Sequence, residues 1–323
     1  MKRITIFLLI AFSVIFAQKT YVPDDKFEQA LIDLGYDTTL DDSVLTANIS
    51  SVTTLDVNNK EISDLTGIEA FTSLTALQCY LNKLTSLDVS NNTALTSLNL
   101  YGNSLTSLDI SKNATLTLLN FSENKITSID LTNNTALNEL NCWKNQLTIL
   151  DVSKNINLKV LNFYSNQLTS LDVSGNTALT YLHSSENKLT SLDVSTNTAL
   201  EYLHCADNQL TSLDVSKNTA LTYIHTGGNP LTSLDVSSNT ALTELHTNSM
   251  ALNSLDVSKN TALKMLFTSA NNLTSLDVSS NTALEYLHAG GNQLTTIDVS
   301  TNDVLRSLVV ENNKLTTLDV SGN

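Results

Sequence analysis

Several residue types are scarce in this chain of 323 residues. It has two prolines, nine glycines, three cysteines and one tryptophan, and only 17 lysines and arginines against 32 aspartates and glutamates. The formal net charge of −15 repels nucleic acid and anionic membranes, so neither is an expected partner. Beyond the N-terminus no apolar run approaches the length that spans a bilayer, so we expect no membrane insertion of the mature chain.

Catalytic motifs are also missing. The sequence contains no GxSxG, no HExxH and no phosphate-binding loop, and its glycines form no repeated loop. Serine, histidine and aspartate are plentiful, but histidine and aspartate recur in separate columns of a repeat that assigns them to opposite faces. We therefore expect a protein that is not an enzyme and that has no cofactor.

The N-terminus is the most apolar segment of the chain. Lys2 and Arg3 precede the run ITIFLLIAFSVIF, and the small residue Ala17 follows it. This arrangement predicts a secretory signal peptide over residues 1–17, because the run is short for an uncleaved anchor. The mature protein is then expected to be secreted or held at the cell surface.

The three cysteines have a regular spacing. Cys79, Cys142 and Cys205 lie 63 residues apart, which is three times the 21-residue repeat described next. Three stacked turns at roughly 4.8 Å each place them about 14 Å apart, whereas a disulfide needs α-carbons within about 7 Å. We therefore expect free, buried thiols that pack as small apolar residues.

A repeat of 21 residues organises the chain. The segment 84–104, LTSLDVSNNTALTSLNLYGNS, is the first of eleven full copies that follow in register up to residue 314, and the partial copy LTTLDVSGN ends the chain. Its L-x-L alternation predicts a strand with one buried face, and stacked turns would bury a continuous core. Two asparagine columns, one interrupted only at Met250, are expected to bond backbone groups of adjacent turns.

The repeat resembles the leucine-rich repeat family over roughly residues 51–323. Leu95, Leu98, Leu100 and Asn103 give LxxLxLxxN, and the doubled form of 11 plus 10 residues is similar to the bacterial IRREKO subclass. The first repeat contains DLTGIEAFTSL, which is similar to the internalin type with a short helical turn. The resemblance implies a solenoid of about 12 turns with a parallel β-sheet on one face, short extended or turn segments on the other, and a role in adhesion or surface interaction.

Both ends of the solenoid carry further predictions. The segment PDDKFEQALIDLGYD has helical spacing, a capping aspartate and Gly35 at its end, so residues 18–50 are expected to form a helical N-terminal cap. The valine of LDVS favours a strand-like back and a weakly curved solenoid. The last turn stops at Asn323 with Leu318 and Val320 bare, so we expect a monomer or an edge-paired molecule, or a fragment that lacks a sorting or anchoring segment.

Aromatic and histidine side chains occupy the outward positions of the predicted front strand. Leu98 and Leu100 point inward, so positions 97, 99 and 101 of each turn point outward. The resulting residues are Tyr101, Trp143, Tyr164, Tyr181, His183, Tyr202, His204, Tyr223, His225, His246, Tyr286 and His288. They predict a surface that recognises a protein or glycan ligand, because tyrosine and tryptophan dominate binding surfaces.

Three alternatives remain for this face. In the first, the tyrosines and histidines are a by-product of gene duplication, and neighbouring strands support one another through cross-strand pairs of these side chains. In the second, adjacent histidines bind a zinc or copper ion between them, although a linear column offers only two ligands per ion. In the third, the whole array of repeats serves as a structural spacer or stalk of a larger surface protein.

A second column is acidic. It contains twelve aspartates, from Asp88 to Asp319, flanked mostly by serine or threonine. The simpler interpretation is that each carboxylate bonds a hydroxyl or a backbone N–H at a bend. The alternative is weak calcium binding by adjacent carboxylates, for which Asp193, Asp214 and Asp235 are the candidates.

Overall fold

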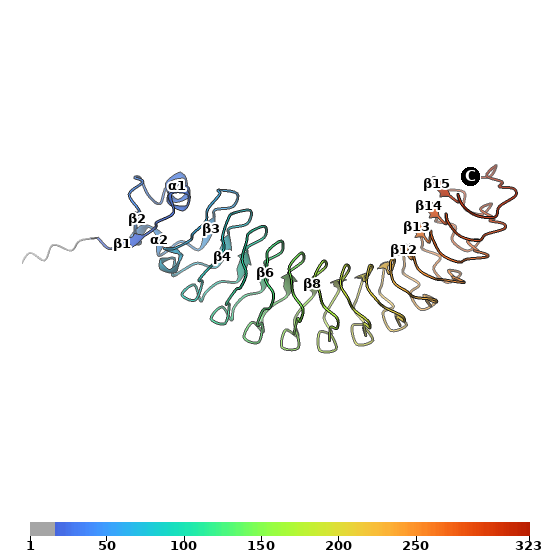
Figure 1. Cartoon of the computed structure of the whole chain (residues 1–323), viewed down its shortest axis with the longest axis horizontal. Coiled ribbons are helices and arrows are strands. Elements are labelled where there is room, and N and C mark those ends of the chain that lie inside the picture. The colour runs from blue at the N-terminus through green and yellow to red at the C-terminus, as the bar shows by residue number, and fades with distance from the viewer. Residues whose placement is uncertain (1–16) are drawn as a thin grey trace, which may run out of the picture.

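A computed structural model describes residues 17–323 of the chain, so all but the last residue of the predicted signal peptide lies outside the described residues. A small N-terminal unit precedes a long, arched stack of turns (Figure 1). This unit pairs two antiparallel strands and contains two helices: β1 Lys19–Tyr21, α1 Asp25–Asp33, β2 Ser43–Leu45 and α2 Thr46–Ile49.

A parallel sheet of 13 strands runs along the stack, with each strand hydrogen-bonded to the next in sequence order. We call it the front sheet. Each strand supplies three residues, and equivalent residues of adjacent turns pair in register, as Leu98 pairs with Leu119. The strands are β3 Thr54–Asp56, β4 Ala76–Gln78, β5 Ser97–Asn99, β6 Leu118–Asn120, β7 Glu139–Asn141, β8 Val160–Asn162, β9 Tyr181–His183, β10 Tyr202–His204, β11 Tyr223–His225, β12 Glu244–His246, β13 Met265–Phe267, β14 Tyr286–His288 and β15 Ser307–Val309.

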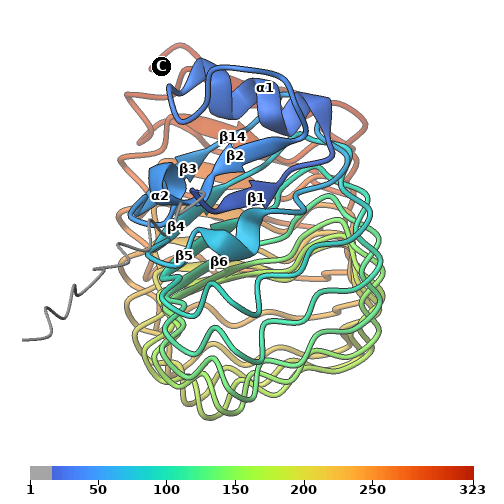
Figure 2. The same cartoon turned by 90° about the vertical axis from the view of Figure 1, so that its left-hand side faces the viewer.

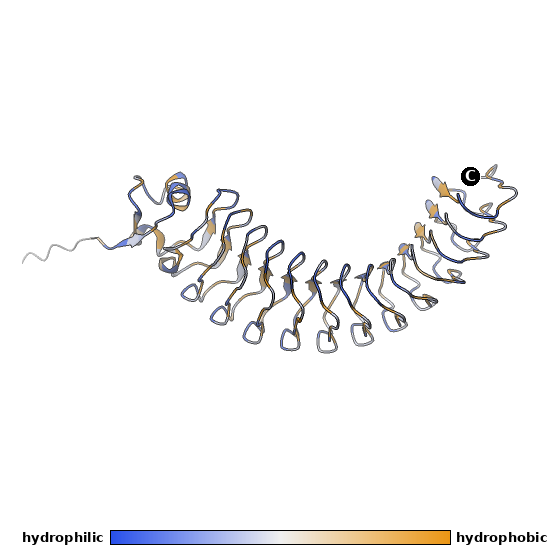
Figure 3. Ribbon diagram, viewed as in Figure 1, coloured by the Kyte–Doolittle hydropathy of each residue, from blue (hydrophilic) through white to orange (hydrophobic). Residues whose placement is uncertain are grey.

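The core lies inside the stack and repeats with the sequence. Leu95, Leu98 and Leu100 are fully buried, and so are their equivalents in most turns. Apolar and polar segments therefore alternate around every turn, as the colouring of Figure 3 shows. The predicted leucine-rich repeat solenoid is confirmed: no single turn encloses its own apolar side, and the stack buries it.

The back of the solenoid differs from the sequence expectation. Within residues 17–323 it holds no second sheet, and its isolated bridge joins Asp88 to Asp109. The solenoid is also clearly arched rather than weakly curved, with the strands toward the inner side (Figures 1 and 2). Backbone hydrogen bonds hold the strands at about 4.8 Å, whereas the back segments lack such a continuous ladder and spread apart.

The N-terminal helix forms where its pattern predicts it. Asp24 caps α1 by accepting hydrogen bonds from the N–H groups of Lys26 and Phe27, and Gly35 follows the helix with a φ of 80°. The ring of Phe27 lies 6.4 Å from that of Phe71 in the first turn, so α1 covers the start of the core. The helical turn expected in the first repeat is a short 3-10 helix, Ile68–Ala70.

One asparagine column, from Asn82 to Asn313, bridges adjacent turns with both ends of its amide. The Nδ2 atom of Asn145 donates to the carbonyls of Phe121 (3.0 Å) and Cys142 (3.2 Å). Its Oδ1 atom accepts from the N–H of Ile126 at 3.0 Å. The buried amide thus satisfies backbone groups that a corner would otherwise leave unpaired, as the sequence predicts.

In the second asparagine column, from Asn92 to Asn323, mainly the Nδ2 donor of each side-chain amide forms hydrogen bonds. The Nδ2 atom of Asn218 donates to the carbonyls of Val194 and Asn197, both at 2.9 Å, while its buried Oδ1 has no partner in the described residues. The first column is broken once, at Met250, which is itself 8% exposed. The two columns therefore hold the corners of each turn by different bonding patterns.

The cysteines are free and buried, as their spacing predicts. Burial raises the pKa of the Cys205 thiol to about 12 and raises those of Cys79 and Cys142 as well. No helix within residues 17–323 has the length and apolarity needed to cross a membrane.

Candidate functional site

Each strand of the front sheet except β15 buries its central residue and presents its two neighbours. In β10, Leu203 is fully buried while Tyr202 and His204 are half-buried. The parallel register repeats this arrangement, so Tyr202 lies beside Tyr223 and His204 beside His225. All twelve residues of the predicted recognition surface are half-buried on this sheet or directly after its strands.

Nine rings form one continuous line along the sheet, which we call the ring ladder. Neighbouring ring centroids lie between 4.2 Å, for His183 and His204, and 5.3 Å, for Tyr101 and Trp143. Several pairs are nearly parallel, with interplanar angles of 8° for Trp143 and Tyr164 and 9° for His183 and His204. In order, its members are Tyr101, Trp143, Tyr164, His183, His204, His225, His246, Phe267 and His288.

The ring ladder changes column halfway along the sheet. Tyr101, Trp143 and Tyr164 follow their strands by two residues, whereas the histidines lie at the strand ends. The change occurs between Tyr164 and His183, whose rings stack at 4.6 Å and 20°. The sequence places these residues in two separate columns, and only their stacking in space joins them.

Small residues make this change of column sterically possible. The position two residues after the strand is Ser185 in the turn of His183, and the Nε2 atom of His183 lies 2.7 Å from the Ser185 hydroxyl oxygen. Ser185 and Ala206 are 4% and 1% exposed, because histidine rings lean over that column. Ser122, Ser185 and Ala206 occupy this outward position but are buried rather than exposed.

A second stack runs beside the histidines. Tyr181, Tyr202 and Tyr223 stack with centroids 4.3 Å apart and planes inclined by 7°, and we call this trio the tyrosine stack. It meets the ring ladder at its end, where Tyr223 lies 5.3 Å from His246. Tyr286 makes no ring contact within residues 17–323, because Glu244 and Met265 separate it from the stack.

Phe267 belongs to the ring ladder although the sequence interpretation does not include it among the site residues. Its ring lies 4.7 Å from that of His246 and 4.6 Å from that of His288. It occupies the same strand position as the histidines, and that shared position is the sequence signal that could have identified it. Stacking continuity, not residue type, defines the site.

Three histidines of the ring ladder, His183, His204 and His225, are held in the neutral form. Burial is the main cause that lowers the pKa of His183 and His225 to about 4 and that of His204 to about 3, and the charges of neighbouring histidines lower them further. Burial also raises the pKa of Tyr202 to about 12. At neutral pH the stacked rings therefore offer uncharged hydrogen-bonding groups along a partly apolar surface.

Charged side chains flank the ring ladder on four of the loops that follow the strands, at Glu123, Lys144, Glu186 and Asp207. In the first half of the sheet, Lys144 pairs with Glu123 at 2.8 Å and lies 5.3 Å from the centre of the Trp143 ring. In the second half the equivalent loop positions are Glu186 and Asp207, which are exposed. The backbone of these residues has a positive φ, 51° for both Glu186 and Asp207, which non-glycine residues seldom adopt.

The stacking geometry does not support the metal interpretation of the histidines. The lone pair of an imidazole nitrogen lies in the ring plane, so nearly parallel rings such as His183 and His204 direct their lone pairs side by side. A metal ion needs lone pairs that converge on one point. The contact between His183 and Ser185 is likewise no catalytic unit, because Ser185 is buried and nothing in residues 17–323 bonds the Nδ1 atom of His183.

The acidic column lies exposed on another side of the turn and takes the simpler of its two predicted roles. Each of its twelve aspartates accepts a hydrogen bond from the backbone N–H two residues later, as Asp214 does from Ser216 at 2.8 Å. This hydrogen bond is the main cause that lowers the pKa of Asp214 below its usual value. The carboxylates are therefore turn-forming groups.

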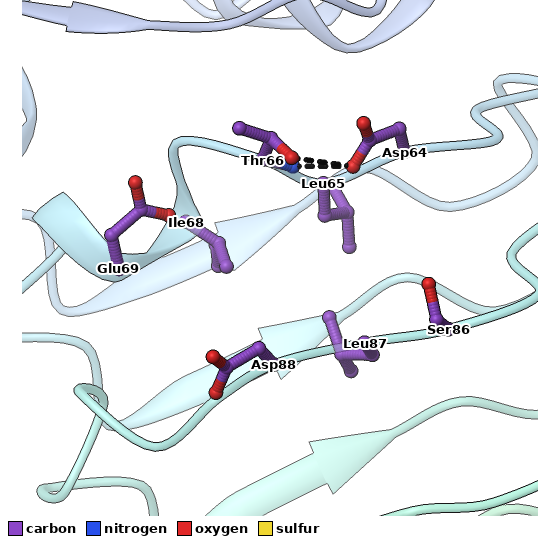
Figure 4. Close-up of a pocket in the computed structure, with 8 residues that line it drawn as sticks. All are labelled: Asp64, Leu65, Thr66, Ile68, Glu69, Ser86, Leu87 and Asp88. Atoms are coloured by element: carbon purple, nitrogen blue, oxygen red, sulfur yellow. Dashed lines mark hydrogen bonds between the residues drawn. The ribbon is translucent and has the colours of Figure 1, made fainter.

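The calcium candidates do not come together as a ligand group. Asp193 and Asp214 line one shallow recess between their turns, and Asp235 is not part of it. A similar recess at the N-terminal end is lined by Asp64 and Thr66 from one turn and by Ser86 and Asp88 from the next (Figure 4). There Asp64 accepts hydrogen bonds from the N–H and the hydroxyl of Thr66, both at 2.8 Å.

Within residues 17–323, Glu28, Asp37 and Asp41 form the one group of three side chains that lies close enough together to hold a metal ion. Glu28 is fully buried and already accepts three backbone hydrogen bonds, from the N–H groups of Asp41, Asp42 and Ser43. Its carboxylate therefore organises the loop after α1.

Comparisons with known proteins agree with this geometry. The family model "Leucine Rich repeat" matches residues 112–133 and 311–323. The solved functional domain of InlJ from Listeria monocytogenes, which includes a cysteine ladder, is 38% identical, with a TM-score of 0.86, over 96% of this chain and 75% of that one. The chain belongs to the leucine-rich repeat family of internalin-like proteins. A leucine-rich repeat protein of Leptospira interrogans is 27% identical, with a TM-score of 0.73, over 77% of this chain and 69% of that one.

Internalin J of Listeria monocytogenes also matches at the sequence level, with 39% identity over 73 residues. The matched segment is 23% of this chain and 8% of Internalin J. In this chain three cysteines occupy every third turn of one buried column, with Leu100 and Phe121 between the first two. The shared architecture extends along the solenoid.

Proposed function

We propose that this chain is a secreted or cell-surface, non-enzymatic binding protein that recognises a protein ligand through the front sheet. The observation that carries the proposal is the ring ladder. Half-buried tyrosine, tryptophan and histidine side chains, already ordered by stacking, provide contact area at little further cost in side-chain entropy. The predicted signal peptide and the internalin-like relatives support an extracellular location.

The orientation of the rings favours a protein over a glycan. Sugars stack on ring faces, but the faces of the interior rings are covered by neighbours, as at His204, with His183 at 4.2 Å and His225 at 4.3 Å. Because these faces are covered, a ligand meets mainly the edges of the interior rings. Such edges suit the hydrogen-bonding groups and apolar side chains of a protein surface.

The test is a variant that removes the centre of the surface. Tyr202, His204, Tyr223 and His225 are replaced by serine, and immobilised wild type and variant are compared in pull-downs from cell-surface extracts and on a glycan array. We expect wild type to capture a protease-sensitive partner, the variant to lose it, and the array to give no signal. The matched control replaces Ile149 and Ile156, exposed apolar residues outside the front sheet, by serine.

Two results would contradict the proposal. Equal capture by the wild type and the front-sheet variant would favour the structural spacer or stalk, because a spacer does not need its surface rings. A glycan-array signal that the front-sheet variant abolishes would show that the ligand is a sugar. Circular dichroism of all variants separates loss of binding from loss of folding.

A further inference from the structure

We propose that the second half of the ring ladder binds a cationic protein segment, whose lysine or arginine side chains are taken up by Glu186, Glu201 and Asp207. This inference rests on the proposed function, because it names the chemistry of the ligand at the same sheet. It is carried by the charge distribution, by an equivalent contact within the chain itself, and by the constrained position of the carboxylates.

The two halves of the sheet differ in charge. The four strand-and-loop segments 96–104, 117–125, 138–146 and 159–167 contain two carboxylates, Glu123 and Glu139, against Lys125, Lys144 and Lys159. The next four segments, 180–188, 201–209, 222–230 and 243–251, contain Glu186, Glu201, Asp207 and Glu244 against Lys188 alone. The local balance therefore changes from +1 to −3 at the point where the ring ladder changes column.

The carboxylates of the second half are available to a partner. Glu186, Glu201 and Asp207 are exposed and form no ion pair within residues 17–323. Glu244 lies 3.6 Å from the Nε2 atom of His246, a histidine that burial keeps toward its neutral form by lowering its pKa. Exposed, uncompensated carboxylates beside an ordered apolar surface attract cations and orient an approaching ligand.

The first half shows how a cation fits against the ring ladder. There the Lys144 ammonium is held by Glu123 at 2.8 Å and lies 5.3 Å from the Trp143 ring centre. Glu186 and Asp207 repeat the loop positions of Glu123 and Lys144, with a second carboxylate in place of the lysine. A lysine or arginine from a partner would supply the charge that Lys144 supplies three turns earlier.

The carboxylate of Asp207 is also held in place. Its backbone has a φ of 51°, and its side chain lies over Gly228 so closely that a Cβ atom at Gly228 would collide with it. Asp207 is near enough to His225 for its negative charge to act on that ring. The close contact with Gly228 restricts where the carboxylate can lie.

The test measures the binding of a short peptide of alternating arginine and serine, at about 0.15 M ionic strength where long-range attraction is screened. The site variant carries Glu186→Gln, Glu201→Gln and Asp207→Asn. The charge-matched control carries Asp256→Asn, Asp277→Asn and Asp298→Asn in the acidic column, where asparagine keeps the oxygen that accepts the turn hydrogen bond. We expect the site variant to bind about tenfold more weakly and the control to bind like wild type.

Equal weakening of both variants would overturn the inference, because binding would then depend on total charge alone. Lack of peptide binding by the wild type would overturn it as well. Either result, together with loss of the captured partner in the front-sheet serine variant, leaves the proposed function intact and removes only the cationic ligand. A peptide of alternating glutamate and serine is the probe control and is expected not to bind.

Discussion

Strands β5–β8 and strands β9–β12 have the same backbone but fill their outward positions in opposite ways. In the first half the strand ends in asparagine and the rings follow two residues later, as Asn162 precedes Tyr164. In the second half the strand ends in histidine and a small residue follows, as Ser185 follows His183. Both arrangements place one ring per turn in nearly the same line, except at Ser122, where Tyr101 and Trp143 meet across the turn.

This comparison shows that the two outward positions are coupled by volume. A ring at one position requires a small or slender side chain at the other, because both occupy the space above the same buried leucine. Interiors and half-buried surfaces tolerate volume-conserving exchanges far better than additions. The change from asparagine to histidine after Asn162 is therefore one half of a paired exchange, which duplication alone does not explain.

The largest expected effect on stability concerns the asparagine column from Asn82 to Asn313, which is continuous in the first half of the sheet and broken by Met250 in the second. Asn145→Met copies that break into the first half. It leaves the buried N–H of Ile126 without the acceptor that now lies at 3.0 Å, so we expect a loss of about 3 kcal/mol in the free energy of unfolding. Urea denaturation followed by circular dichroism measures it.

The control for this prediction is Met250→Leu. The site already lacks the amide, so a swap of similar volume should cost less than about 1.5 kcal/mol. If Asn145→Met cost no more than Met250→Leu, the column would contribute nothing that the apolar core does not already provide, and its bonding role would be wrong.

The next effect tests the coupling of the two outward positions directly. Ser185→Tyr adds a ring where His183 already leans over the site, and overpacking should cost about 2 kcal/mol. The double variant His183→Asn, Ser185→Tyr recreates the Asn162–Tyr164 pair of the preceding turn and should recover most of that loss. A double-mutant cycle in urea measures the coupling; additive losses would mean that the two positions are independent.

A pH-dependent effect comes from three histidines that only the second half contains, His183, His204 and His225. The folded pKa values of His183, His204 and His225, about 3 to 4, lie below the value of about 6.5 in an unfolded chain. Between these values the unfolded state binds more protons, so the stabilisation is complete above pH 6.5 and is lost as the pH falls toward 4. We expect the melting temperature to decrease by a few degrees between pH 7 and pH 5.

Replacing His183, His204 and His225 by asparagine, the residue of the first half, should flatten this pH dependence. The aspartates of the acidic column titrate at lower pH, because their hydrogen bonds lower their pKa values, so they do not contribute in this window. An unchanged pH dependence in the asparagine variant would assign the effect to other groups.

Much of the molecule follows from its sequence because the repeat is strict. The solenoid, its inward leucines, the buried free cysteines, the capped helix α1 and the bonding of both asparagine columns are all predicted by local pattern. The residues on the front sheet are also predicted, since a strand alternates its side chains. The features that the sequence did not predict are relations between turns: the pronounced arch, the absence of a second sheet at the back, and the inclusion of Phe267 in the ring ladder.

The sequence by itself determined which side chains form the apolar core, because a 21-residue period and a two-residue strand alternation fix which residues of each turn face inward. Only the tertiary structure decided that Tyr164 and His183, from different columns, stack at 4.6 Å, and that their line continues over nine rings. That outcome depends on how far each ring leans across the adjacent small residue. Such leaning is set by packing between turns, which a pattern within one turn does not contain.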